Sequence, residues 1–311
     1  MNIQQLQYVL AVAEKRHFET AAESCFVTQS TLSTMISKLE EELGLKIFDR
    51  KRKPVEVTQE GEILIEQFKT IQLEISRLTE ITKEIKGEVK GNLSIAVIPT
   101  IAPFLLPLFL QSFAEQFPEL LIKVREQTTA EILRQLKSRD LDIGIISIPV
   151  DDPEIEEWKL YDEPFVYYSQ NELNKLQVSV GDIDRNNLCL LEEGHCMRTQ
   201  VLKLCDLQDN ELLTKLNFEY KAGSIDSLLR FVKANKAATL LPYLSTVDWN
   251  EEAKQHLSEF LPPVPYRSVG IVVHRHFVKR KVLDLLLKEI NQKLAPILPK
   301  SLDLGAQIRP M

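Results

Sequence analysis

Four cysteines occur in this chain of 311 residues, and one of them lies in a setting that suits thiol chemistry. Cys196 follows Gly194 and His195 and precedes Arg198, so two side chains able to donate to a sulfur anion lie within two residues of it. A thiolate is the nucleophilic form of cysteine, and nearby positive charge or the free amides at a helix N-terminus lower the pKa of a thiol. We therefore expect a lowered pKa and a reactive thiol at Cys196.

The other cysteines are more ordinary. Cys25 lies in a predicted helix and Cys189 in the apolar run 188–191, where cysteine usually acts as a small buried hydrophobe. Cys205 lies nine residues after Cys196, and inert burial stays an alternative for both. The spacing shows no CxxC and no Cys/His ligand set, and a scaffold of disulfides would need more cysteines. We expect no metal, no cofactor and at most a transient disulfide.

The composition is that of a globular protein with about two domains, at roughly 150 residues each. It is 44% hydrophobic and 27% charged with a net charge of −7, which excludes a chain that coats nucleic acid or anionic membranes throughout. The longest apolar run, 101–110, is half the ~20 residues that a membrane helix needs, and no signal peptide is evident. We expect a cytoplasmic protein without a membrane partner.

Residues 1–58 predict a winged helix-turn-helix domain. Helical spacing covers 4–14 and 18–24, and Thr28 is a suitable N-cap for a third helix that ends at Gly44. A second helix that follows a short turn and exposes short polar side chains is typical of DNA-reading heads. Alternation at 55–57, after the basic run 50–53, predicts a hairpin wing. The expected DNA contacts are Gln29, Ser30, Thr31, Ser33, Thr34 and Lys38 from the helix, with Arg50 and Arg52 from the wing.

Charge in this head is focused rather than uniform. Residues 1–58 hold eight basic and eight acidic side chains, but five of the basic ones fall within 46–53. This distribution favours local contacts to phosphates, with modest base readout because the recognition helix contains no arginine. The alternative is a small helical domain whose basic turn is merely solvated.

Residues 59–87 predict one long helix. Its apolar positions are spaced as a heptad seam, with Thr82 in the one polar slot: Leu64, Phe68, Ile71, Ile75, Leu78 and Ile85. Such a stripe must be buried, and a second copy of the chain is the expected partner. Packing on the chain's own large domain is the alternative.

The region after the hinge 87–91 alternates strands with helices, which predicts a mostly parallel α/β sheet. The expected strands are 93–98, 121–124, 141–146, 165–168, 188–191, 237–241 and 267–274, and the expected helices are 102–117, 130–137, 224–235 and 279–294. Two lobes joined by crossing strands would enclose a cleft, with lobe I at about 91–162 and 267–295 and lobe II at about 163–266. The tail after Pro296 shows no period and is expected to be loose.

The run Phe18-x2-Ala21-Ala22-x4-Val27-Thr28-Gln29-Ser30-x-Leu32-Ser33, continuing to Leu43-Gly44-x2-Ile47-Phe48-x-Arg50, resembles the LysR-type bacterial transcription regulators. The resemblance extends over nearly the whole chain. It implies a DNA-binding domain at 1–58, a dimerisation helix at 59–87 and, at 91–311, a two-lobed α/β regulatory domain like the periplasmic binding proteins.

Residues 191–205 resemble the peroxide-sensing members of that family, as do 98–100, 126–129 and 224–228. This resemblance implies that Cys196 is the peroxidatic thiol and Cys205 the resolving thiol, and that hydrogen peroxide is bound by Thr100, Thr129, His195 and Arg198. Thr128 remains an alternative to Thr129. It also implies that the protein activates antioxidant genes. The partners that it implies are double-stranded DNA, RNA polymerase and further copies of the chain, as a dimer or tetramer. Glutaredoxin or thioredoxin would be the reductant.

A disulfide between these thiols would require a conformational change. Residues nine apart in a continuous helix have Cα atoms ~13 Å apart, whereas a disulfide needs about 4.4–6.8 Å. If 196–205 is helical when reduced, oxidation must unwind it and shift the arrangement of subunits. Two other functions stay open: a thiol peroxidase, and a LysR-type regulator that binds a small molecule in its cleft and has incidental cysteines.

Overall fold

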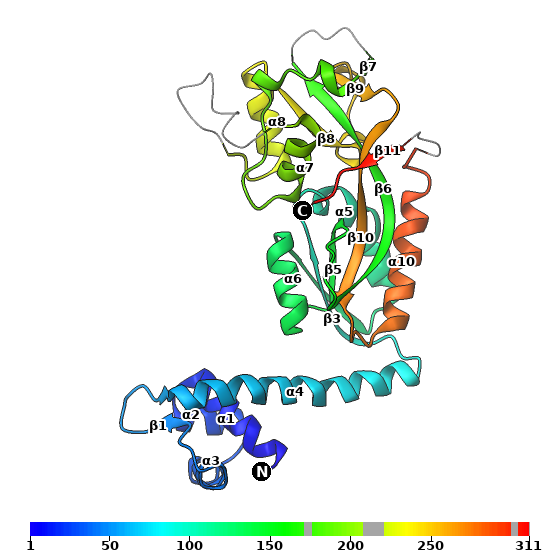
Figure 1. The fold of residues 1–311 in the computed structure, drawn as a ribbon. Helices are drawn as coiled ribbons and strands as arrows, with labels where there is room; N and C mark the ends of the chain where they lie inside the picture. The colour runs from blue at the N-terminus through cyan, green and yellow to red at the C-terminus, as the bar shows by residue number, and fades with distance from the viewer. Residues whose placement is uncertain (171–175, 208–220, 300–303, 311) are drawn as a thin grey trace. The chain divides into compact units, whose positions relative to one another are not determined.

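The fold, seen in a computed structural model, is described for residues 1–170, 176–207, 221–299 and 304–310 (Figure 1). The chain divides into two compact units, Met1–Lys86 and Gly87–Met311.

The first unit is a winged helix-turn-helix followed by a long helix. It contains α1 (Ile3–Lys15), α2 (Phe18–Ser24), α3 (Gln29–Leu43), the two-stranded wing β1 (Phe48–Asp49) and β2 (Glu56–Val57), and α4 (Gln59–Ile85). The wing strands are antiparallel. Thr28 caps α3 by accepting from the Thr31 N–H, and Gly44 ends that helix with a left-handed φ of 69°. The predicted winged fold is confirmed.

Glu40 joins α3 to the wing. Its side chain is fully buried and Oε1 accepts the backbone N–H groups of Ile47 at 2.9 Å and Phe48 at 3.3 Å. Arg50 donates to its Oε2 at 3.3 Å. The carboxylate thus satisfies two buried amides and fixes the start of the wing relative to the recognition helix.

We expect Glu40→Ala to loosen the head, because two buried N–H groups would lose their acceptor at ~1–3 kcal/mol each. Amide hydrogen exchange over residues 29–57 of the full-length protein should become faster by one to three orders of magnitude. Glu41→Ala, at the exposed neighbouring position, is the control and should change little. Equal protection in both variants would contradict a structural role for Glu40.

The predicted seam of α4 is only partly buried within the first unit. Leu64 and Phe68 pack into the core that α1, α2 and α3 share, whereas three later members are exposed: Ile71 by 38%, Leu78 by 64% and Ile85 by 81%. The exposed half is the part of the seam that a second copy could cover.

Lobe I of the second unit is built on parallel strands and the helices beside them. Its elements are β3 (Gly91–Val97), α5 (Ala102–Gln116), β4 (Leu120–Glu126), α6 (Thr129–Ser138), β5 (Ile143–Ile148) and α10 (Arg280–Leu294). Strand β3 lies between β4 and β5, parallel to both. Gly144 in β5 is required for space, because a Cβ there would lie 2.5 Å from Ile132 of α6.

Two long strands, β6 (Ile155–Ser169) and β10 (Val264–His274), connect lobe I to lobe II. They are antiparallel to each other, and β6 continues into lobe II, where it pairs with β8 (Ala238–Pro242) and β9 (Leu257–Phe260). Lobe II also holds β7 (Gln177–Val178), α7 (Cys196–Cys205), α8 (Ile225–Ala234) and α9 (Glu251–Lys254). The lobes have separate hydrophobic cores.

Three expectations for this unit are wrong. The sheet is not mostly parallel, because β10 pairs antiparallel with β5 and β6, and β8 and β9 pair antiparallel with β6. Residues 188–191 form no strand but two isolated bridges, at Leu188 and Leu191. The tail is not loose where it is described, since β11 (Leu304–Gln307) pairs with β10.

Candidate functional site

A narrow cavity, too tight in this structure to hold a water-sized sphere, lies where α7 begins. We call it the thiol cavity; it is lined by Ile98, Pro99, Thr100, Thr128, Thr129, Gly194, His195 and Cys196. Residues 98–100 follow β3 and residues 128–129 follow β4. Because β3 and β4 are parallel neighbours, their carboxyl ends meet at one edge of the sheet and bring these segments together.

Cys196 is the first residue of α7 and is 8% exposed. The turn that precedes it needs Gly194, whose φ of 94° is strained for any other residue. His195 is the N-cap residue, is equally buried, and its Nε2 lies 3.8 Å from Glu192 Oε1. The thiol therefore lies among the free amides of a helix N-terminus.

The expected lowering of the Cys196 pKa is wrong in sign. Burial raises the pKa of this thiol, against the opposing effects of the Arg267 charge, the Thr129 hydroxyl and the backbone N–H groups of Met197 and Cys196 itself. Desolvation disfavours the thiolate more strongly than these groups favour it. The fraction of Cys196 present as thiolate thus depends on these few neighbouring groups in a buried site.

The charge of Arg267 is the largest of these opposing effects, although Arg267 was not among the residues expected at the site. It is 1% exposed, donates from Nη1 to Thr100 Oγ1 at 3.0 Å and from Nη2 to the Thr100 carbonyl at 3.1 Å. Glu163 binds it, with Nε and Nη2 each 2.8 Å from Oε2. The only feature of the sequence that could have indicated this role is a lone arginine at the start of the mostly apolar stretch 267–273. A charge buried in such a strand requires a partner.

The two threonines after β4 have different roles. Thr128 caps α6 and exchanges hydrogen bonds with Glu131. Thr129 is buried, and its Oγ1 has no nitrogen or oxygen partner in the described part of the chain, so its hydroxyl is available to the Cys196 thiol. Both threonines line the cavity, and Thr129 is the one whose hydroxyl interacts with the Cys196 thiol.

Arg198 does not line the thiol cavity. Its Nη1 instead donates to the Leu191 carbonyl at 3.0 Å, which ties the second residue after Cys196 back to the preceding loop. Of the expected peroxide contacts, Thr100, Thr129 and His195 line the cavity with Cys196. Arg267 does not line it either, but it donates to Thr100 and its charge acts on the Cys196 thiol.

Cys205 is the last residue of α7, so the helix begins at one thiol and ends at the other. Both are free, and a helix of that length separates their Cα atoms by ~13 Å. Cys196 belongs to the lobe I core and Cys205 to the lobe II core. Residues 196–205 are thus helical with both thiols free, and the helix holds the thiols apart.

Burial raises the pKa of Cys205 to about 11, against an ordinary value of 9.0. Below pH 9 both folded and unfolded chains keep this thiol protonated, so it does not affect stability. Between pH 9 and 11 only the unfolded chain ionises it, and the free energy of unfolding falls by at most about 2 kcal/mol.

We expect Cys205→Ala to remove the part of the fall in unfolding free energy between pH 9 and 11 that Cys205 causes. Urea unfolding followed by tryptophan fluorescence reports the second unit, since both tryptophans, Trp158 and Trp249, lie in it. With reductant present, the unfolding midpoint of the variant should fall less steeply from pH 9 to 11 than that of the unchanged chain. Identical slopes would contradict the raised pKa.

The expected DNA-binding face is on one side of α3. Its exposed members are Gln29, Ser30, Thr31, Thr34 and Lys38, and Ser33 is half-buried. Arg50 donates to the hydroxyls of Ser33 and Ser37, each at 3.0 Å, and its guanidinium lies 5.0 Å from the Phe18 ring centre. Arg50 therefore positions the recognition helix, besides the DNA contact predicted for it.

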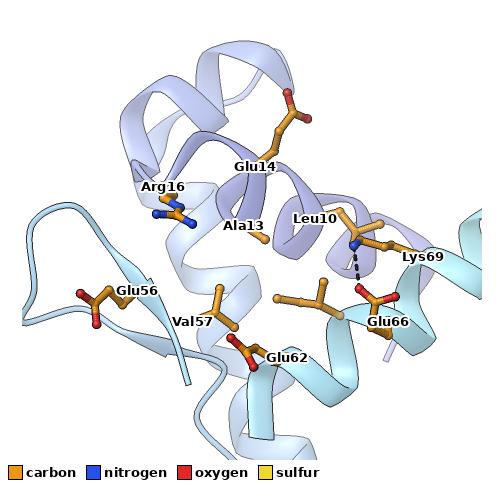
Figure 2. A pocket seen from close by; sticks show the side chains of 10 residues that line it. Leu10, Ala13, Glu14, Arg16, Glu56, Val57, Glu62, Glu66 and Lys69 are labelled. Carbon is orange, nitrogen blue, oxygen red and sulfur yellow. Dashed lines mark hydrogen bonds and ion pairs between the residues drawn. The ribbon is translucent and has the colours of Figure 1, made fainter. Parts of the chain in front are cut away.

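A second, wider groove lies within the first unit (Figure 2). Leu10 and Ala13 of α1 face Val57 of the wing and the start of α4, and carboxylates line the rim. The ion pair between Lys69 and Glu66, 2.7 Å long, lies at one end. None of its lining residues is a cysteine, histidine, serine or threonine, so it carries no thiol, imidazole or hydroxyl group.

The described residues contain no group of three or more His, Cys, Asp or Glu side chains placed to hold a metal ion. None of the helices in the described ranges is long and apolar enough to cross a bilayer.

Comparison with protein families agrees with this architecture. The model of the bacterial regulatory helix-turn-helix protein, lysR family, matches residues 3–62, and that of the LysR substrate binding domain matches residues 86–295. The chain belongs to the LysR family of bacterial transcription regulators. Its DNA-binding head and its two-lobed unit are thus those of a LysR protein, and the relatives are regulators rather than enzymes.

Within the LysR family the chain is similar to OxyR proteins. It is 35% identical to the DNA-binding transcriptional dual regulator OxyR of Escherichia coli K12 over 300 residues, 94% of this chain and 96% of that one. It is also 35% identical to the hydrogen peroxide-inducible genes activator of Pectobacterium carotovorum, covering 88% and 90%. A full-length OxyR variant from Pseudomonas aeruginosa has the same fold, with a TM-score of 0.68 and 27% identity over 94% and 98% of the chains.

Proposed function

We propose that this LysR regulator senses hydrogen peroxide through Cys196 and stores the signal as a reversible Cys196–Cys205 disulfide. The disulfide changes the arrangement of subunits on DNA and activates antioxidant genes. The observation that carries the proposal is a buried thiol at the N-terminus of α7, in a cavity with Thr100, Thr129 and His195, with the second thiol at the far end of the same helix. Relatives whose names describe peroxide-inducible activation support it.

The chemistry needs two steps and releases two waters. The Cys196 thiolate attacks one oxygen of peroxide, the O–O bond breaks, and the leaving hydroxide takes a proton, which gives a sulfenic acid and water. Thr100 and Thr129 can bind the two oxygens, while Arg267 favours the thiolate. The Cys205 sulfur then attacks the sulfenic sulfur and releases the second water, and a dithiol reductant such as glutaredoxin or thioredoxin reopens the bond.

The second step requires α7 to unwind, because a disulfide needs Cα atoms about 4.4–6.8 Å apart. Unwinding removes Met197 and Val201 from the lobe II core, at ~1.5–3 kcal/mol for each buried side chain. Rearrangements of this size can shift a weak subunit interface.

Peptide mapping by mass spectrometry after stoichiometric peroxide tests the proposal. We expect a Cys196–Cys205 disulfide and new proteolytic cleavage within 196–206, both lost in Cys196→Ser, whose DNA binding should persist. Cys189→Ser is the matched control and should behave as the unchanged chain. A Cys196→Ser variant that still responds to peroxide would favour the alternative of a small-molecule effector in the cleft. Repeated turnover of peroxide with excess reductant would favour a thiol peroxidase.

A further inference from the structure

The C-terminal residues 304–310 lie against α7, the helix that carries both thiols. Strand β11 adds to β10 in parallel, and the Ile308 N–H donates to the Tyr266 carbonyl at 2.8 Å. The Ile308 carbonyl accepts from Gln200 Nε2 of α7 at 2.7 Å. In Figure 1 the chain that follows β11 runs toward α7. We call residues 304–310 the strap.

Gln200 is the point at which α7, lobe I and the strap meet. Its side chain is fully buried, and Nε2 also donates to Ser147 Oγ of β5 at 3.0 Å. Its Oε1 is buried without a hydrogen-bond partner within the described ranges. One amide group therefore joins three segments that are distant in sequence, and does so with one of its own groups unsatisfied.

The strap is held on both lobes. Gln307 Nε2 donates to the Ile148 carbonyl of lobe I at 2.9 Å, and the Ile308 side chain packs against the lobe II core. Arg309 forms an ion pair with Asp151 at 3.2 Å, but their side chains are 61% and 74% exposed. An exposed ion pair adds little. The main polar contacts of the strap to α7 and lobe I are therefore the buried amide of Gln200 and the half-buried amide of Gln307.

We propose that the strap binds α7 only in its helical form, through Gln200, and is released when α7 unwinds. The oxidation step of this inference rests on the proposed function; the coupling between α7 and the strap does not. The strap would thus stabilise the reduced state and, once free, expose the edge of β10 together with a C-terminal peptide.

Position in the helix explains the coupling. Gln200 lies four residues after Cys196 and five before Cys205, so a disulfide that brings those two within about 7 Å must displace it. Its unsatisfied Oε1 gains a water partner on release, which offsets part of the lost hydrogen bonding. Because coupling is reciprocal, a bound strap that stabilises the helical form of α7 must itself bind more tightly when α7 is helical.

The coupling can be tested in the reduced full-length protein without peroxide. In Gln200→Leu, which keeps similar volume and removes the amide, we expect hydrogen exchange of 304–308 to become about tenfold faster, the ratio for loss of a buried hydrogen bond. Arg309→Ala is the matched control and should change exchange less than twofold. Deletion of 304–311 should in turn speed exchange within 196–205 about tenfold. Unchanged exchange in both the Gln200→Leu and the deletion variant would overturn the proposal.

The oxidation step is tested by the same measurement after peroxide. Exchange of 304–308 should rise in the unchanged chain and stay protected in Cys205→Ser, which cannot form the Cys196–Cys205 bond. A strap that stays protected while mass spectrometry shows the disulfide would overturn release. Absence of the disulfide would contradict the proposed function instead. The result with Gln200→Leu would then still show whether α7 and the strap are coupled.

Discussion

Arg267→Gln should slow the reaction of Cys196 with peroxide at least about tenfold at neutral pH. Arg267 lowers the pKa of this thiol, so its loss raises that pKa further and reduces the thiolate fraction at any given pH. An opposite charge nearby is worth about 1–3 pKa units. Thiolate nucleophilicity rises with pKa and offsets part of that loss. The variant also loses both hydrogen bonds to Thr100, which positions that hydroxyl.

The measurement is the rate of sulfenic acid formation against pH, in a Cys205→Ser background so that the reaction stops there. The profile of Arg267→Gln should move to higher pH. Arg198→Gln is the matched control, since Arg198 Nη1 donates to the Leu191 carbonyl outside the cavity, and it should change the rate less than twofold. Equal slowing in both variants would contradict the assignment of Arg267.

A double variant separates chemistry from folding. Arg267→Gln alone leaves Glu163 as an unpaired buried carboxylate, which is strongly destabilising. Arg267→Gln with Glu163→Gln removes both charges and should recover most of the stability while the reaction stays slow. A double variant that reacted as fast as the unchanged chain would show that the net field of the ion pair, rather than Arg267, is what the thiol senses.

Local features of the fold could be predicted from the sequence because local interactions determine them. The N-cap at Thr28 and the C-cap at Gly44 were identified correctly, since capping depends on residues within one helical turn. The helix that begins at Cys196 was considered from the sequence only as a condition, and the structure shows it.

Features that depend on distant segments could not be predicted in this way. Arg267 is 71 residues after Cys196 and reaches the site only because β10 runs between the lobes, next to β6. The order of strands, and hence the antiparallel share of the sheet, likewise depends on long-range pairing. The strap was missed because β11 has no alternation of its own and is defined by β10.

The sign of the Cys196 pKa shift shows a further limit. The neighbours in sequence indicated a lowered pKa, but the dominant effect is burial, which follows from packing and not from residue type. A buried thiol that is mostly protonated still suits a sensor, because reaction then depends on the donors lining the cavity rather than on general reactivity toward oxidants.

The second large effect is expected at the exposed half of the α4 seam. We propose that this half of the seam pairs two copies of the chain. Leu78→Glu should then convert a dimer to a monomer and weaken binding to a two-site operator about 100-fold or more. Ile71, Leu78 and Ile85 lie on one face, and burying each against a second copy is worth ~1.5–3 kcal/mol. A charge in the centre of that face removes this gain and adds the cost of burying an unpaired carboxylate.

The loss in DNA affinity arises because the DNA-binding domains of two copies are no longer joined, and not from any contact that Leu78 makes with DNA. In a dimer the second head binds as an intramolecular step at high effective concentration, which raises overall affinity by 10²–10⁴. Sedimentation and gel-shift titration of the full-length protein measure both properties. Ser76→Glu, at an exposed position on another face of α4, is the control and should stay dimeric. A Leu78→Glu protein that stays dimeric would mean that the chain associates through another surface, with the exposed seam packing on its own second unit.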